Sequence, residues 1–195
     1  MSGAARLFTS RPLFWALLAL PAVPMLATAT APGADFEELL HPSGEWSARL
    51  LVVALILTPL SLLLPRNGGV RWLLARRRAI GVAAFGYAAL HTVFYVAAMG
   101  NLDDILAELG ATGIWTGWLA LLVMVPLAVT SNDATMRALR AGWKRLQRLA
   151  YVAAILTLVH WITVHDGLGA ALVHFAPLAL LQLYRIAHPK LKGTA

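Results

Sequence analysis

Two histidines inside apolar stretches are the residues of this sequence best suited to chemistry. His91 lies 13 residues after Arg78, and His160 lies 12 residues after Arg148. If each arginine marks the start of an apolar helix, both imidazoles lie roughly 18–20 Å along parallel helices. Two neutral imidazoles at one level on different helices can serve as the two axial ligands of a b-type haem, because histidine is a common ligand of haem iron.

A structural role is the alternative for each of these histidines. Inside a membrane bundle, an imidazole can simply hydrogen-bond a neighbouring helix, a contact that contributes ~1 kcal/mol. For a single histidine the two interpretations are balanced. Two histidines at matched depth on parallel helices favour iron ligation.

His174 is a third histidine at a similar depth, on a helix expected to run in the opposite direction. It is therefore an alternative iron ligand, or a hydrogen-bonding partner for a haem propionate or a quinone. His165 follows His160 by five residues, which places it about 140° round the helix, so that both cannot easily face one cofactor. His41 and His188 fall in polar segments, where solvation accounts for them.

A run of three arginines precedes the helix of His91. Arg76, Arg77 and Arg78 most simply anchor that helix to anionic headgroups. The functional alternative is that Arg77 and Arg78 bind a flavin phosphate or a haem propionate at the cytoplasmic face.

The elements that carry these residues are expected to be long apolar helices. Of the 195 residues, 59% are hydrophobic and 13% are charged, whereas a soluble domain is about 25% charged. We predict an all-α integral membrane protein, because a lipid-exposed backbone must satisfy its own hydrogen bonds. A bundle of about six transmembrane helices would form one domain over residues 1–195. The expected spans are residues 13–31, 47–64, 79–99, 111–130, 149–165 and 168–184.

Charge placement predicts the orientation of this bundle. Fifteen of the sixteen basic residues fall in segments that share one side of a six-helix protein, and eight of the nine acidic residues fall on the other side. Basic residues concentrate in cytoplasmic segments, so both termini are expected in the cytoplasm. The net charge of +7 is then a topology signal, and no nucleic-acid partner is expected. The sequence has no cysteine, which excludes disulfides, thiolate-bound iron–sulfur clusters and covalently attached c-type haem.

Residues 1–31 allow two interpretations. They resemble a signal peptide that ends in the small residues Ala29-Thr30-Ala31. The alternative, which we favour, is a retained first helix kinked at Pro21 and Pro24. Cleavage would leave five spans with the same orientation.

Several motifs resemble the ferric-reductase-like transmembrane proteins. Within that family, the similarity is greatest to the haem-binding membrane subunits of periplasmic methionine sulfoxide reductase systems, and it covers about residues 41–161. The matching motifs are Ser43-Gly44-Glu45-Trp46 before Leu57-Thr58-Pro59-Leu60, Arg77-Arg78-Ala-Ile-Gly81 with Phe85, Tyr87, Leu90-His91 and Tyr95, Pro126-Leu-Ala-Val-Thr-Ser131 with Trp143 and Leu146, and Tyr151 through His160-Trp161.

The resemblance implies a b-haem protein of the bacterial inner membrane. Such a protein takes electrons from the quinone pool and passes them to a soluble periplasmic molybdenum-containing reductase, which repairs oxidised methionines. The resemblance also implies an association with flavin mononucleotide, and it makes His91 and His160 the haem ligands. The protein would be an electron-transfer subunit without catalytic residues of its own.

One position departs from the family pattern. The family usually has a histidine 13 residues before His160, where this sequence has Gln147. Thirteen residues span about 19.5 Å of helix, the separation that stacks two haems in related reductases. An amide is a poor iron ligand, and Arg78 lies at the equivalent level on the helix of His91. We therefore predict one haem near the outer face and a weakened or absent inner site.

Other functions stay open at this point. A cofactor-free membrane scaffold or assembly protein would tolerate substitution of both histidines. A divergent ferric-reductase-like cytochrome would use another acceptor. A small transporter is disfavoured, because the span centres show no acidic residue and no inverted repeat is evident.

Overall fold

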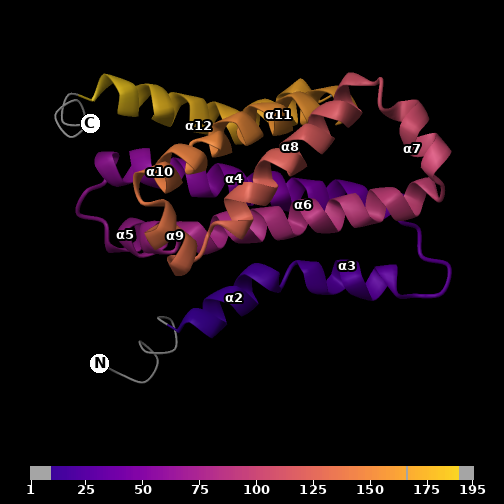
Figure 1. The fold of residues 1–195 in the computed structure, drawn as a ribbon, viewed down its shortest axis with the longest axis horizontal. Coiled ribbons are helices and arrows are strands. Elements are labelled where there is room, and N and C mark those ends of the chain that lie inside the picture. Colours follow the sequence, from indigo (N-terminus) through magenta and orange to yellow (C-terminus); the bar gives the residue numbers. More distant parts are fainter. Residues whose placement is uncertain (1–9, 166, 189–195) are drawn as a thin grey trace.

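The computed structural model describes residues 10–165 and 167–188, and every regular element in these ranges is a helix (Figure 1). Five helices are long and apolar enough to cross a membrane, and a bent pair makes a sixth span if it is counted as one. The predicted all-helical membrane architecture is therefore confirmed, with five to six spans. The orientation of the termini stays a prediction. Arg6, Asp166, Lys190 and Lys192, which contributed to it, lie outside the described residues.

The first apolar stretch forms two short helices instead of one. Helix α2 (Arg11–Ala19) and helix α3 (Ala22–Ala29) meet at an angle of 49°. Ser10 caps α2, because its side chain accepts a hydrogen bond from a backbone amide of the first turn. The break falls at Pro21, one of the two predicted kinks, since proline lacks the amide hydrogen that would continue the ladder. Pro24 lies inside α3, near its start.

Helix α4 (Glu37–Leu63) begins ten residues before the predicted span. The polar segment that precedes residue 47 has one buried side, which includes Leu39 and Ser43, and the Ser43 hydroxyl donates to the Leu39 carbonyl at 2.6 Å. Tertiary packing therefore makes this segment helical although its hydropathy is low. As a result, Glu45 and Arg49 lie within a long helix, whereas the predicted boundary left Glu45 in a loop.

The remaining long helices agree with the predicted spans to within a few residues. They are α6 (Arg77–Met99), α8 (Thr112–Val129), α11 (Leu149–His165) and α12 (Leu168–Ala187). Short helices gather at the two ends of the bundle, with α5 (Gly68–Ala75), α9 (Asp133–Leu139) and α10 (Ala141–Gln147) at one end and α7 (Leu102–Glu108) at the other (Figure 1). Asn67, Asn101 and Asn132 cap α5, α7 and α9 by accepting from backbone amides of the first turn.

Two closely packed helix pairs form the body of the bundle. Helix α4 packs along α6, and α8 packs along α11, while α12 lies against α4. Ala48, Ala84 and Ala153 are fully buried, as expected where small residues let membrane helices approach closely. The Ser47 hydroxyl donates to the Ala84 carbonyl at 2.9 Å and links α4 to α6. The candidate residues His91 of α6 and His160 of α11 lie where these two pairs face each other.

Candidate functional site

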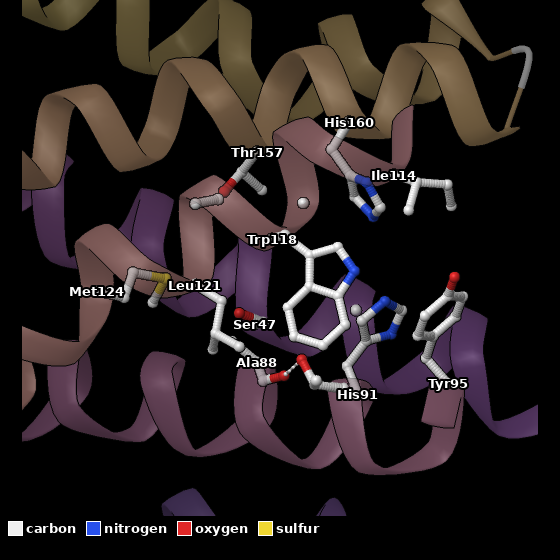
Figure 2. Close-up of a pocket in the computed structure, with 14 residues that line it drawn as sticks. Ser47, Ala88, His91, Tyr95, Ile114, Trp118, Leu121, Met124, Thr157 and His160 are labelled. Carbon is white, nitrogen blue, oxygen red and sulfur yellow. Dashed lines mark hydrogen bonds between the residues drawn. The ribbon is translucent and has the colours of Figure 1, made fainter. Parts of the chain in front are cut away.

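His91 and His160 face each other across the bundle. Their ring centroids are 6.0 Å apart, and the ring planes meet at 82°. Both rings line one cavity of about 90 Å³ that is bounded by α4, α6, α8 and α11 (Figure 2). The structure thus brings together the two histidines that the depth argument placed at one level.

The Nδ1 atom of each ring contacts a backbone carbonyl of the adjacent helix. His91 Nδ1 lies 3.0 Å from the Leu40 carbonyl of α4, and His160 Nδ1 lies 2.6 Å from the Gly113 carbonyl of α8. A carbonyl can only accept, so each Nδ1 carries the ring proton. The lone pair of each neutral ring is therefore on Nε2, which is the arrangement of a histidine prepared to bind a metal.

The centroid distance of the pair is compatible with one metal ion held by both imidazoles. A metal–imidazole bond is about 2 Å long, so two rings on opposite sides of one ion have centres roughly 6 Å apart. Within residues 10–165 and 167–188, no group of three or more His, Cys, Asp or Glu side chains could hold a metal ion. The pair therefore suits a metal that brings its other ligands with it, as porphyrin iron does.

Aromatic side chains surround the imidazoles. Figure 2 shows Trp118 and Tyr95 beside the two rings. Their ring centroids are 6.2 Å apart, and the Tyr95 hydroxyl donates to Glu108 of α7 at 3.0 Å. The cavity is thereby linked to the short helix at its end of the bundle. Sequence reasoning did not single out Trp118, because an isolated tryptophan in a span carries no distinguishing signal.

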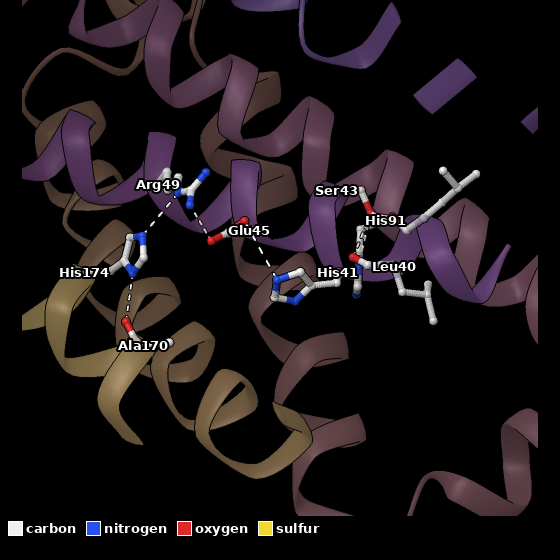
Figure 3. Close-up of polar contacts among 9 residues, drawn as sticks. Leu40, His41, Ser43, Glu45, Arg49, His91, Ala170 and His174 are labelled. Atoms are coloured by element: carbon white, nitrogen blue, oxygen red, sulfur yellow. Dashed lines mark hydrogen bonds and ion pairs between the residues drawn. The ribbon is translucent and has the colours of Figure 1, made fainter. Parts of the chain in front are cut away.

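His174 lies on the other side of α4 and does not line the cavity (Figure 3). Its Nδ1 is 2.8 Å from the Ala170 carbonyl of its own helix, and its Nε2 accepts from Arg49 Nε at 3.2 Å. Its ring lies against Trp161, with centroids 5.1 Å apart. In this position His174 fastens α12 to α4, and it is not brought to the histidine pair.

Arg49 belongs to a line of ionisable residues along α4. His41, Glu45 and Arg49 follow one another at intervals of four residues, so they share one face of the helix. Glu45 forms an ion pair with Arg49, and His41 Nε2 lies 3.9 Å from Glu45. Sequence reasoning gave this line no role, because the predicted span began at residue 47 and left Arg49 at its edge. Ionisable side chains at membrane depth are costly and usually paired.

A second cavity, of about 440 Å³, lies toward the end of the bundle that carries α10. Aromatic side chains and an apolar floor complete it, and no Asp or Glu is among the lining residues in the described ranges. Its cationic lining residues are Arg77, Arg78, Lys144, Arg148 and Arg185. Arg77 and Arg78, for which anion binding is the alternative to anchoring at the headgroups, both line this basic cavity.

These two arginines also hold neighbouring helices. Arg77 donates to the Thr58 hydroxyl of α4 at 2.6 Å, and Arg78 forms an ion pair with Asp133 of α9 at 2.6 Å. Hydrogen bonding and attraction from Arg78 keep the pKa of the Asp133 carboxyl below its ordinary value. Gln147 lines the same cavity, and its amide donates to the Leu127 carbonyl at 3.1 Å.

The profile of the family described as "Ferric reductase like transmembrane component" matches residues 43–158, which include His91 and end two residues before His160. The protein-methionine-sulfoxide reductase heme-binding subunit MsrQ of Rhizobium meliloti is 36% identical over 159 residues, which cover 77% of this chain and 71% of the relative. Proteins of the same name from Brucella ovis and Brucella suis are each 35% identical over 165 residues, covering 83% of this chain and 71% of theirs. No solved structure matches the chain.

Proposed function

This chain belongs to the ferric reductase-like transmembrane family, and from that premise we propose that it is the haem-binding electron-transfer subunit of a methionine sulfoxide reductase system. The observation that carries the proposal is the facing pair of His91 and His160, whose Nε2 lone pairs and 6.0 Å separation suit one iron between them. The relatives that are 35–36% identical are named heme-binding subunits, and this agrees with the chemistry of the pair.

His91 and His160 would hold the haem iron. A b-type haem supplies a one-electron carrier when it is bound. The chain contributes the orientation of both rings through their carbonyl partners. One haem per chain is proposed, because Gln147 offers only an amide at the inner level.

The basic cavity is the proposed site of the electron donor. Five cationic side chains line it, and Trp143 and Tyr151 add aromatic surface. This combination suits a planar molecule that carries negative charge or hydrogen-bond acceptors, such as flavin mononucleotide or a quinone. Arg77 and Arg78 would contact its phosphate or carbonyl oxygens.

The proposed setting is the bacterial inner membrane, with both termini in the cytoplasm and residues 1–195 as one domain. In this orientation the histidine pair lies in the outer half of the bundle and the basic cavity in the inner half. Electrons would pass outward to a periplasmic molybdenum-containing reductase.

Electron transfer to such a partner tests the proposal. The purified protein, in lipid nanodiscs and reduced with dithionite, would be mixed with the sulfoxide reductase catalytic subunit encoded in the same genome. We expect the haem, followed by its absorbance, to be reoxidised only when both the catalytic subunit and methionine sulfoxide are present. Failure to reoxidise with both present would contradict the assigned partner and favour a cytochrome with another acceptor. A colourless protein would favour a cofactor-free scaffold.

A further inference from the structure

Each imidazole of the pair rests against a glycine of the neighbouring helix. A Cβ atom added to Gly117 would lie 2.7 Å from Nδ1 and 2.9 Å from Cε1 of His160. One added to Gly44 would lie 3.1 Å and 3.2 Å from the same atoms of His91. An alanine at residue 117 would therefore displace the His160 ring, and an alanine at residue 44 would press on the His91 ring.

The same local arrangement surrounds both glycines. The carbonyl that accepts from each ring lies four residues before the glycine, at Leu40 for Gly44 and at Gly113 for Gly117. Positions four apart lie one helical turn apart on one face. The glycine therefore forms the floor beneath the ring, and the carbonyl one turn away holds its Nδ1.

A buried hydroxyl completes each arrangement. The residue before the glycine is Ser43 in α4 and Thr116 in α8, and both are almost completely buried. Each hydroxyl donates most closely to the carbonyl four residues before it, Leu39 or Thr112, at 2.6 Å. It also lies 3.0 Å from the carbonyl that accepts from the imidazole, Leu40 or Gly113. A carbonyl oxygen has two lone pairs and can accept from both groups. Two helices that are not neighbours in the chain thus present the same seat, a carbonyl, a hydroxyl and a glycine, to the two histidines.

We infer that these seats position the two iron ligands, with Gly117 and Gly44 as the positioning residues that set the height and tilt of each imidazole. The inference rests on the proposed function for the identity of the metal group. The contact between ring and glycine is independent of that group. Because the separations are shorter at Gly117, substitution there has the larger effect.

Matched alanine variants test this inference. Gly117→Ala and Gly44→Ala would be compared with Gly86→Ala, since a Cβ atom on Gly86 of α6 meets nothing within 4 Å. The measurements are haem per chain by pyridine haemochrome and the low-spin EPR signal of the oxidised protein. We expect Gly117→Ala to lose haem at least tenfold, Gly44→Ala to keep haem with shifted g values, and Gly86→Ala to match the wild type. Unchanged haem content and g values in both Gly117→Ala and Gly44→Ala would overturn the inference.

A double-variant cycle separates ring positioning from general helix packing. Thermal unfolding would be measured for Gly117→Ala alone, for His160→Ala alone and for the double variant, without reference to haem. If the glycine accommodates the ring, its substitution lowers Tm when His160 is present and has little effect when the ring is absent. Equal losses of Tm in both backgrounds would overturn the inference. Wild-type protein that binds no haem would refute the proposed function instead, and this cycle would still decide the contact.

Discussion

At the scale of single residues, His91 and His160 differ from His174 in the hydrogen-bond partners of their ring nitrogens. His91 and His160 use Nδ1 to bond a carbonyl of another helix, which leaves the ring lone pair on Nε2. His174 uses Nδ1 on its own helix, and its Nε2 accepts from Arg49. Counting residues from the flanking arginines predicted the His91–His160 pair. It could not rank His174, because depth alone does not tell which side of a helix faces which neighbour.

The first prediction concerns these three histidines. His91→Ala or His160→Ala should remove most of the haem absorbance of the purified protein, because each substitution deletes one of the two proposed iron ligands. His174→Ala should keep it, because that ring is already bonded between α12 and α4. Absorbance in the Soret region, normalised to protein, is the measurement. Full retention of this absorbance in both the His91 and His160 variants, or its loss in the His174 variant alone, would contradict the ligand assignment.

At the scale of elements, α4 supports both the site and the bundle. One face contacts His91 through Leu40, Ser43 and Gly44, while another carries the line that ends at Arg49 and holds α12. The sequence predicted the apolar part of this helix and missed its first ten residues. Their polarity lowered the hydropathy, and only the packing of their buried side against other helices makes them helical. The seats at Gly44 and Gly117 could not be predicted either, since they require knowing that α4 pairs with α6 and α8 with α11.

The second prediction concerns the tie between α4 and α12. Arg49→Gln should lower the free energy of unfolding by roughly 1–3 kcal/mol, less than for a fully buried pair, because both charged side chains are partly exposed. The substitution leaves Glu45 without its cation and removes the donor to His174. Unfolding in mixed detergent micelles gives the value. The double variant Glu45→Gln/Arg49→Gln should recover part of the lost free energy of unfolding. A double variant whose loss exceeds the sum of the losses of the two single variants would contradict the pairing.

At the scale of the whole molecule, the described residues give the bundle two chemically different ends. The basic cavity with α9 and α10 lies toward one end, and the histidine pair is linked to α7 at the other. Composition sufficed to predict a helical membrane bundle. The sequence predicted a first helix kinked at Pro21 and Pro24, and the structure breaks it at Pro21 into α2 and α3. The angle of 49° between them could not be read from the sequence, because α2 contacts α6 and α3 contacts α4.

The third prediction concerns orientation, and the absence of cysteine from the sequence makes it simple to test. Asp103→Cys in α7 and Arg137→Cys in α9 provide single thiols at the two ends. In intact spheroplasts, a membrane-impermeant maleimide should label the cysteine at 103, and it should label the cysteine at 137 only after lysis. The reverse pattern would place the histidine pair in the cytoplasmic half and exclude a periplasmic acceptor.

The most direct test of the central claim is a dithionite-reduced minus air-oxidised absorbance spectrum of the purified protein, combined with pyridine haemochrome quantification. The facing pair of His91 and His160, together with an amide at Gln147, predicts a sharp b-type α-band and one haem per chain. Two haems per chain would contradict the prediction of a weakened or absent inner site. A protein without haem, after expression with ample haem supply, would contradict the electron-transfer function itself.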